Sequence, residues 1–187
     1  PGSDPISESV WQLTGFQRAF DDYGADCAKS PDCPLGTDPT QFVARYHQLI
    51  DPLVARPAAT SDGRGLGYAD AITGTANALY GKRYWPYLTS GLLGLQRGTD
   101  PGDLLQLADD YWHRDAAGRY RNQQDAFTAI RCVDAPYPRD PAAWVDADRR
   151  TRAAAPFMGY GTFTGYAPRD TCALWPVPST RAPAEAT

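Results

Sequence analysis

Three of the five Asp-Pro pairs in this chain constrain its fold more than any other sequence feature. They stand at Asp38-Pro39, Asp100-Pro101 and Asp140-Pro141. An aspartate side chain accepts hydrogen bonds from the free N–H groups of a helix's first turn, and proline suits the first helical position because it has no N–H. Apolar residues at helical spacing follow each pair, so each pair predicts the start of an α-helix.

Four further helices are predicted from the spacing of apolar residues elsewhere in the chain. They are expected from Ser7 to Gly24, over 68–80, from Trp85 to just before Gly98, and over 123–132 with Asn122 as the cap. Residues 56–67 carry no periodicity and contain three glycines, which predicts a mobile loop. About seven short helices without a convincing strand predict an all-α fold.

The chain changes character after Pro156. Prolines recur at positions 168, 176, 178 and 183, and they forbid regular structure, so an extended C-terminal tail docked on the helices is expected. Residues 4–178 are expected to form one helical domain, followed by a flexible segment over 179–187. Pro1-Gly2-Ser3 resembles the remnant of a cleaved affinity tag and is left out of the fold.

Four cysteines, an even number, permit three disulfide connectivities. We favour Cys27–Cys33, which would close a turn, and Cys132–Cys172, which would tie a helix end to the tail. The spacing fits no zinc motif, and no metal or cofactor is expected. Four free thiols in a cytosolic protein remain the alternative, but disulfides and an exported location are preferred.

The charge balance argues against a nucleic-acid partner. Lys and Arg total 18 against 22 Asp and Glu, so the net charge is -4 and no basic surplus is available for phosphates. The longest apolar stretches are far shorter than the roughly 20 residues that cross a bilayer. Neither DNA or RNA binding nor a membrane span is expected.

Catalytic groups are scarce in this sequence. The chain has two histidines, His47 and His113, and no serine stands in the Gly-x-Ser-x-Gly pattern of a hydrolase nucleophile. The neighbouring carboxylates Asp109 and Asp110 point about 100° apart on a helix, which indicates a solvated face better than paired acid–base chemistry. Aromatic residues make up 12% of the chain, and some rings could line a groove for a peptide or another apolar ligand.

The order of several short motifs resembles one family of enzymes. These motifs include Cys33-Pro34-Leu35-Gly36, Trp85-Pro86-Tyr87-Leu88, Ile130-Arg131-Cys132-Val133-Asp134 and Cys172-Ala173-Leu174-Trp175-Pro176. Over about residues 8–178 the chain is similar to the lid of actinobacterial exported α/β-hydrolases of the tripeptidyl aminopeptidase type, among them mycobacterial envelope serine proteases and carboxylesterase-A-like proteins.

This resemblance implies a part of an enzyme whose catalytic serine, acid and histidine lie on an α/β-hydrolase core outside this segment. The lid would gate the active site of a secreted or cell-envelope enzyme and help to select a peptide or ester substrate, without being catalytic itself. Lids of this kind can supply carboxylates that hold a substrate's α-amine. Asp134 is the first candidate, Asp109 or Asp110 the second, and Tyr111 and Trp112 complete the expected substrate-binding set.

Two other functions stay open at this point. One is a freestanding secreted helical module that binds a protein or a lipid through an aromatic face. The other is a structural adaptor made only for assembly. A Gly-x-Ser-x-Gly motif encoded shortly upstream would favour the lid.

Overall fold

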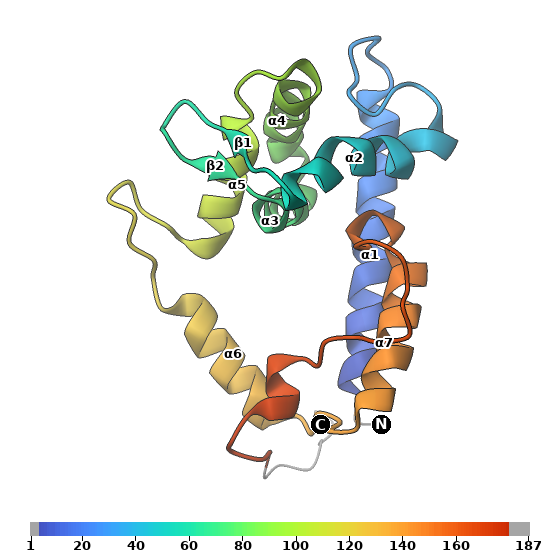
Figure 1. Ribbon diagram of the computed structural model, residues 1–187, viewed down its shortest axis with the longest axis vertical. Helices are drawn as coiled ribbons and strands as arrows, with labels where there is room; N and C mark the ends of the chain where they lie inside the picture. The colour runs from blue at the N-terminus through green and yellow to red at the C-terminus, as the bar shows by residue number, and fades with distance from the viewer. Residues whose placement is uncertain (1–3, 180–187) are drawn as a thin grey trace. The chain divides into compact units, whose positions relative to one another are not determined.

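The computed structural model describes residues 4–179, and these residues are largely helical, as Figure 1 shows. Seven α-helices lie within them, which confirms the all-α prediction. Their bounds are α1 Pro5–Cys27, α2 Phe42–Ile50, α3 Tyr68–Leu79, α4 Trp85–Arg97, α5 Gly102–Trp112, α6 Gln123–Asp134 and α7 Pro141–Ala154. Five short 3-10 turns accompany them: η1 Pro39–Gln41, η2 Asp51–Val54, η3 Lys82–Tyr84, η4 Pro156–Met158 and η5 Thr171–Leu174. The expected tag remnant at 1–3 and the segment 180–187 lie outside the described residues.

The three Asp-Pro pairs stand at helix starts. Asp38 and Asp140 are the N-caps of η1 and α7 as predicted, whereas the N-cap of α5 is Pro101, one residue later than predicted. In each, the aspartate Oδ1 accepts a hydrogen bond from the backbone N–H two residues later, at 2.9 Å for Asp38, 2.8 Å for Asp100 and 2.9 Å for Asp140. The first pair opens η1, which runs on into α2. These bonds satisfy N–H groups that a helix start leaves without partners.

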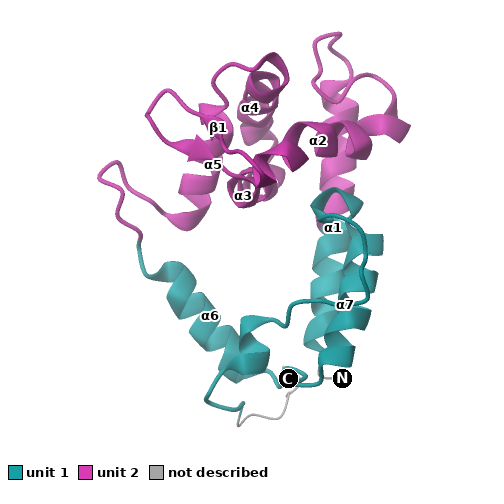
Figure 2. Ribbon diagram, in the orientation of Figure 1, with its two compact units in different colours: residues 1–15, 121–187 teal, residues 16–120 magenta. Residues whose placement is uncertain are grey.

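The described chain divides into two compact units, which are coloured separately in Figure 2. Unit 1 consists of residues 4–15 and 121–179, and unit 2 of residues 16–120. The first part of α1 belongs to unit 1 and the rest to unit 2, while α2–α5 lie in unit 2 and α6 and α7 in unit 1.

Unit 2 is built on close packing of α3, α4 and α5. Gly91 on α4 faces Leu104 on α5 so closely that a Cβ atom there would lie 2.8 Å from the Leu104 backbone nitrogen. A buried aromatic contact joins α1 to α2, with the Phe20 and Tyr46 rings 5.2 Å apart. The Tyr46 hydroxyl donates a 2.8 Å hydrogen bond to Thr75 Oγ1, so its polar atom is satisfied inside the core.

Unit 1 has a smaller core that includes part of the C-terminal tail. Ile6, Trp144, Ala147 and Ala173 form this cluster. Because Ala173 belongs to η5, the tail docks on the helices, as expected. Two 3-10 turns, η4 and η5, interrupt the extended run.

The predicted end of the first helix at Gly24 is wrong. Helix α1 continues to Cys27, and Gly24 lies inside it. A Cβ atom at Gly24 would overlap the ring of Phe42. The glycine therefore allows an aromatic ring to approach the helix and does not end it.

The predicted loop over 56–67 contains a short antiparallel hairpin. Strand β1 (Ala58–Ala59) pairs with β2 (Gly65–Leu66), and Gly63, with φ of 82°, lies in the turn between them. Two residues per strand are too few to show the alternating pattern that reveals a strand in a sequence. Two predictions are therefore wrong: the fold does contain a pair of short strands, and residues 56–67 are not irregular throughout.

Both predicted disulfides are present. Cys27–Cys33 joins Cα atoms 5.3 Å apart, and Cys132–Cys172 joins Cα atoms 4.7 Å apart, which leaves no free cysteine. The second bond connects the last turn of α6 to η5 within unit 1. Over residues 4–179, no helix is both long enough and apolar enough to cross a membrane.

Candidate functional site

The two histidines have local contacts that account for their positions. His47 Nδ1 lies 3.0 Å from Asp51 Oδ1, one helical turn further along the chain. His113 ends α5 in the left-handed conformation with φ of 52°, and its backbone N–H binds the Asp110 carbonyl at 3.2 Å. Among residues 4–179, no group of three or more His, Cys, Asp or Glu side chains could hold a metal ion.

Asp109 is a buried carboxylate near the end of α5. Arg64, from the hairpin, donates Nη1 to Oδ1 at 3.0 Å and Nη2 to Oδ2 at 2.6 Å. Arg64 also binds Asp62 through Nε at 2.7 Å, and hydrogen bonds to Asp109 and then Asp62 raise the pKa of its guanidinium. Asp109 therefore anchors the hairpin to α5, and its role toward a substrate stays a prediction.

Asp110, the next residue, is exposed and lines an open groove of about 310 Å³ in unit 2. Gln106 Nε2 donates a 2.9 Å hydrogen bond to its carboxylate. The groove is lined by Tyr84, Tyr87, Asp103, Gln106, Leu107 and Asp110. Two carboxylates beside two tyrosine rings suit a cationic group such as an ammonium, through charge-assisted hydrogen bonds and cation–π contact.

Tyr111 and Trp112, the last two residues of α5, form an aromatic pair outside this groove. Their rings meet edge to face with centroids 5.3 Å apart, and Trp112 is 40% exposed. Tyr80, 62% exposed, packs edge to face on Phe16 at 5.3 Å. These side chains give unit 2 exposed aromatic area of the kind that contacts apolar ligands.

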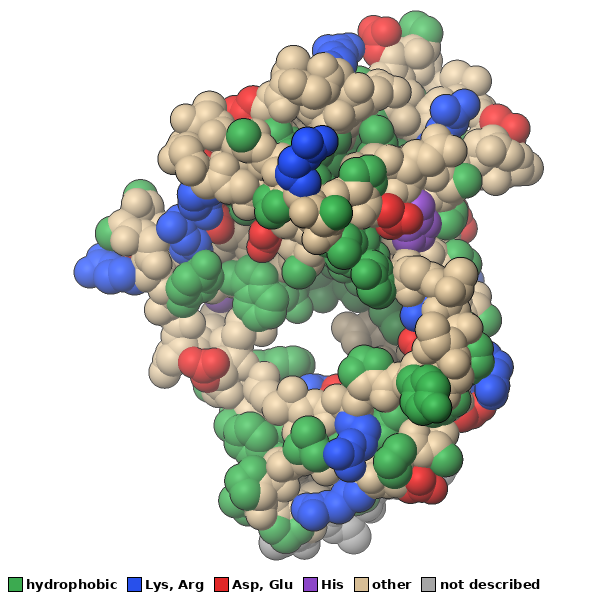
Figure 3. Space-filling model, in the orientation of Figure 1, with side chains coloured by type: hydrophobic (Ala, Val, Ile, Leu, Met, Phe, Trp, Pro, Cys, Tyr) green, Lys and Arg blue, Asp and Glu red, His purple; other side chains and the backbone are tan. Residues whose placement is uncertain are grey.

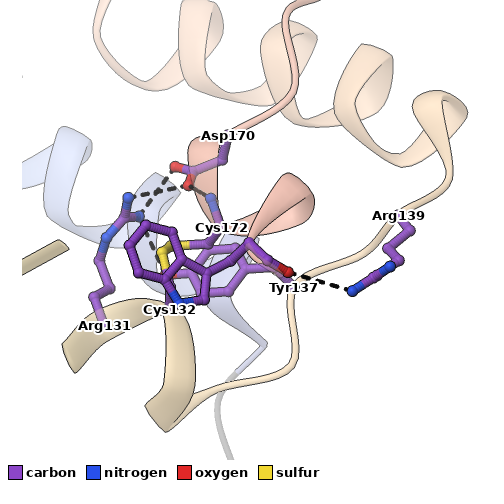
Figure 4. The surroundings of a disulfide bond; sticks show 7 residues. Arg131, Cys132, Tyr137, Arg139, Asp170 and Cys172 are labelled. Atoms are coloured by element: carbon purple, nitrogen blue, oxygen red, sulfur yellow. Dashed lines mark hydrogen bonds and ion pairs between the residues drawn. A yellow bond between two sulfur atoms is a disulfide. The ribbon is translucent and has the colours of Figure 1, made fainter. Parts of the chain in front are cut away.

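Asp134 lies in unit 1, whereas the other four predicted substrate-binding residues lie together at the end of α5 in unit 2. It is the last residue of α6 and is exposed. As Figure 4 shows, the end of α6 is fixed to η5 by Cys132–Cys172 and by Arg131, which forms two 3.0 Å hydrogen bonds to Asp170. Asp134 therefore stands on a helix end with a rigid attachment.

A larger cavity of about 640 Å³ lies elsewhere in unit 2. Cys27, Cys33, Tyr23 and Trp85 are among the residues that line it, and it contains none of the predicted substrate-binding residues. Its size falls within the range of small-molecule sites. Its lining mixes carboxylates with Lys82 and Arg97, so no one class of ligand is favoured.

Sequence reasoning missed the groove partners of Asp110, although the sequence carried a signal for them. Asp103, Gln106 and Asp110 stand three and four residues apart, which places them on one face of α5. Tyr84 and Tyr87 are also three residues apart. The contact between Arg64 and Asp109 spans 45 residues, and no local pattern indicates it.

No family model matches this chain, but individual proteins are similar to it. It is 68% identical over 183 residues, 98% of this chain, to the carboxylesterase B of Mycobacterium tuberculosis. It is 53% identical over 191 residues to the serine protease Hip1 of the same organism, again with 98% of this chain covered. A putative hydrolase of Escherichia coli, YuaR, is 26% identical over 132 residues, 71% of this chain.

The chain spans only about a third of the length of these mycobacterial relatives, 35% of carboxylesterase B and 36% of Hip1. The resemblance to mycobacterial hydrolases is therefore confirmed at the level of hydrolase and serine protease relatives. The match is consistent with this chain being a segment of a larger hydrolase.

Proposed function

We propose that this chain is the helical lid of a secreted or cell-envelope serine hydrolase, an aminopeptidase-like protease that gates its active site through these helices. One observation carries the proposal: 98% of the chain matches a carboxylesterase at 68% identity but covers only 35% of that enzyme. The matching stretch has no Gly-x-Ser-x-Gly motif. Two disulfides support an oxidising location.

Under this proposal the chemistry is divided between two parts of one enzyme. The nucleophile, its base and the groups that stabilise the oxyanion belong to the α/β-hydrolase core. The lid limits access to the cleft, excludes water and contributes contacts that distinguish substrates. No step that makes or breaks a bond is assigned to a residue of this chain.

Carboxylates on the lid would hold the free α-amine of a peptide. Asp110 is the stronger candidate in unit 2 because it is exposed and shares its groove with Asp103 and two tyrosines. Asp134 is the candidate in unit 1. Asp109 would act indirectly, because both of its oxygens already accept hydrogen bonds from Arg64.

The test compares Asp110→Asn and Asp134→Asn in the full-length enzyme that contains this segment. Loss of a charged hydrogen bond worth about 1.5–3 kcal/mol should lower kcat/KM for peptides with a free N-terminus about ten- to a hundredfold. N-terminally blocked peptides should be affected far less. Asp125→Asn on the exposed first turn of α6 is the matched control. Equal losses on free and blocked peptides would remove the amine-anchor role.

The exposed aromatic rings of Tyr80 and Trp112 favour one alternative, a freestanding secreted module that binds a protein or a lipid. The two functions differ in what the gene encodes around this segment. A Gly-x-Ser-x-Gly motif shortly upstream supports the lid, and its absence would favour the binding module.

A further inference from the structure

Helix α6 has very little burial within its own unit. Only Cys132 of its 12 residues is buried, whereas α3, also 12 residues long, buries six. A helix of this length is marginal in water without tertiary packing on one face. The burial of α6 within unit 1 is therefore too small to account for a stable helix.

The contacts that hold α6 come from Cys132 and Arg131, which point about 100° apart on the helix. Cys132 is bonded to Cys172 of η5, and Arg131 pairs with Asp170 just before η5 (Figure 4). At 100° per residue, the midpoint of Phe127 and Ile130 lies about 170° around the helix from Cys132. The disulfide therefore lies opposite Phe127 and Ile130, while Arg131, one turn after Phe127, stands at the edge of their side. The two apolar side chains remain exposed beside it.

The exposed part of this side is apolar. Phe127 is 60% exposed and Ile130 59%, and Leu174 of the adjoining η5 is 60% exposed. Figure 3 shows hydrophobic side chains gathered over the part of unit 1 that contains α6 and η5. We call Phe127 and Ile130 the α6 face. Large apolar side chains together on one exposed helix side are typical of an interaction surface.

We propose that the α6 face packs against the α/β-hydrolase core of the same enzyme, an inference that rests on the proposed function. Nearly two thirds of the length of carboxylesterase B lies outside the segment that matches this chain. Under the proposed function, the corresponding region is the core, and it is large enough to cover this face. Packing on the core would bury the α6 face and give the helix the tertiary contact that unit 1 does not provide.

This placement also locates Asp134 relative to the core. Asp134 follows Phe127 by seven residues, so it lies on the same side of α6 at the helix end. With the α6 face seated on the core, Asp134 stands at the rim of the interface and is not buried inside it. A carboxylate at that rim is available to a substrate in the cleft between lid and core.

The test is hydrogen exchange, followed by mass spectrometry, on the full-length enzyme and on the 187-residue chain alone. Amides of residues 123–134 should exchange more than about tenfold more slowly in the full-length enzyme. The double variant Phe127→Asp with Ile130→Asp should abolish that difference while the Cys132–Cys172 bond stays intact by mass. Trp11→Asp, at an 80% exposed position on α1 in the same unit, is the matched control and should leave the difference unchanged.

The outcomes separate this inference from the proposed function. If other segments of the chain are protected in the full-length enzyme but 123–134 are not, the docking of α6 is refuted and the lid stands. If no segment gains protection, the lid proposal itself fails. If the protection of 123–134 rises with protein concentration, a second copy covers the α6 face and the inference is overturned.

Discussion

Substitution of Gly91 by alanine tests the close packing of α4 on α5. A Cβ atom at Gly91 would lie 2.5 Å from Leu104 Cβ and 2.8 Å from the Leu104 backbone nitrogen. Carbon atoms in van der Waals contact are about 3.5–4.0 Å apart, so roughly 1 Å of separation must be created. Because one of the crowded atoms is backbone, a side-chain rotation does not relieve the clash, and α5 itself must shift.

The expected change in the free energy of unfolding of Gly91→Ala is the sum of two opposing effects. Overpacking costs about 1–3 kcal/mol, and the better helix propensity of alanine returns about 0.8–1 kcal/mol. We expect Gly91→Ala to lower the free energy of unfolding by about 1–2 kcal/mol, near the upper end because backbone must move. Gly15→Ala is the matched control: it also lies inside a helix, and a Cβ atom there meets nothing within 4 Å. Gly15→Ala should raise the free energy of unfolding by about 0.8–1 kcal/mol.

Urea denaturation of the 187-residue chain, followed by far-UV circular dichroism, measures both variants. In thermal unfolding, a chain of this size shifts by about 2–4 °C per kcal/mol, so the two variants should differ by roughly 4–12 °C. If Gly91→Ala is as stable as Gly15→Ala, α4 and α5 do not approach as closely as described, and the reasoning is refuted.

Three further predictions concern the disulfide and the carboxylates. Replacing Cys132 and Cys172 with serine should lower the free energy of unfolding by about 2–5 kcal/mol, measured by urea denaturation; no loss would show that the bond is dispensable. Asp109→Asn should destabilise the chain by about 1–3 kcal/mol because Arg64 loses one of its two charged partners, the one that ties the hairpin to α5, and an unchanged denaturation midpoint would contradict the anchoring of the hairpin. Hydrogen bonds from Thr60 and then Arg64 lower the pKa of Asp62 from 3.8 to about 2, so its contribution to stability is complete above about pH 4 and is lost as the pH falls through 2. Wild type and Asp62→Asn should therefore converge in stability between pH 4 and pH 2, and a constant difference would count against the hydrogen bonds of Asp62.

The helices that could be predicted from the sequence are those with local chemical signals. Asp38, Asp100 and Asp140 cap the N–H groups two residues later, and Gly98 ends α4 in the left-handed conformation with φ of 64°. A glycine alone does not show whether a helix ends, because Gly24 lies inside α1 and makes room for the Phe42 ring, a contact that depends on the tertiary fold.

The spacing of apolar residues does not predict the later part of α7. The apolar residues that predict this helix, Trp144, Val145 and Ala147, end at position 147, yet the helix continues to Ala154. Ion pairs at helical spacing line this part, with Arg152 Nε 2.8 Å from Asp148 Oδ2 and Arg149 Nη1 3.2 Å from Asp146 Oδ1. Charged pairs three or four residues apart support a helix without any apolar periodicity.

For the candidate site, the sequence located residues but not their partners. Asp110 and its aromatic neighbours follow from their order along α5, while the pairing of Asp109 with Arg64 depends on how the hairpin folds back. Burial of Asp109 also separates it from Asp110, a distinction that two adjacent aspartates do not reveal in a sequence.

The central claim is that this chain is the lid of a serine hydrolase and has no nucleophile of its own. Labelling by a fluorophosphonate probe, with the labelled residue identified by mass spectrometry, tests it on the full-length enzyme and on the isolated chain side by side. We predict that a serine outside the matched segment is labelled in the full-length enzyme and that the isolated chain shows only background. A labelled serine within residues 4–179, or a full-length protein that takes up no label, would contradict the claim.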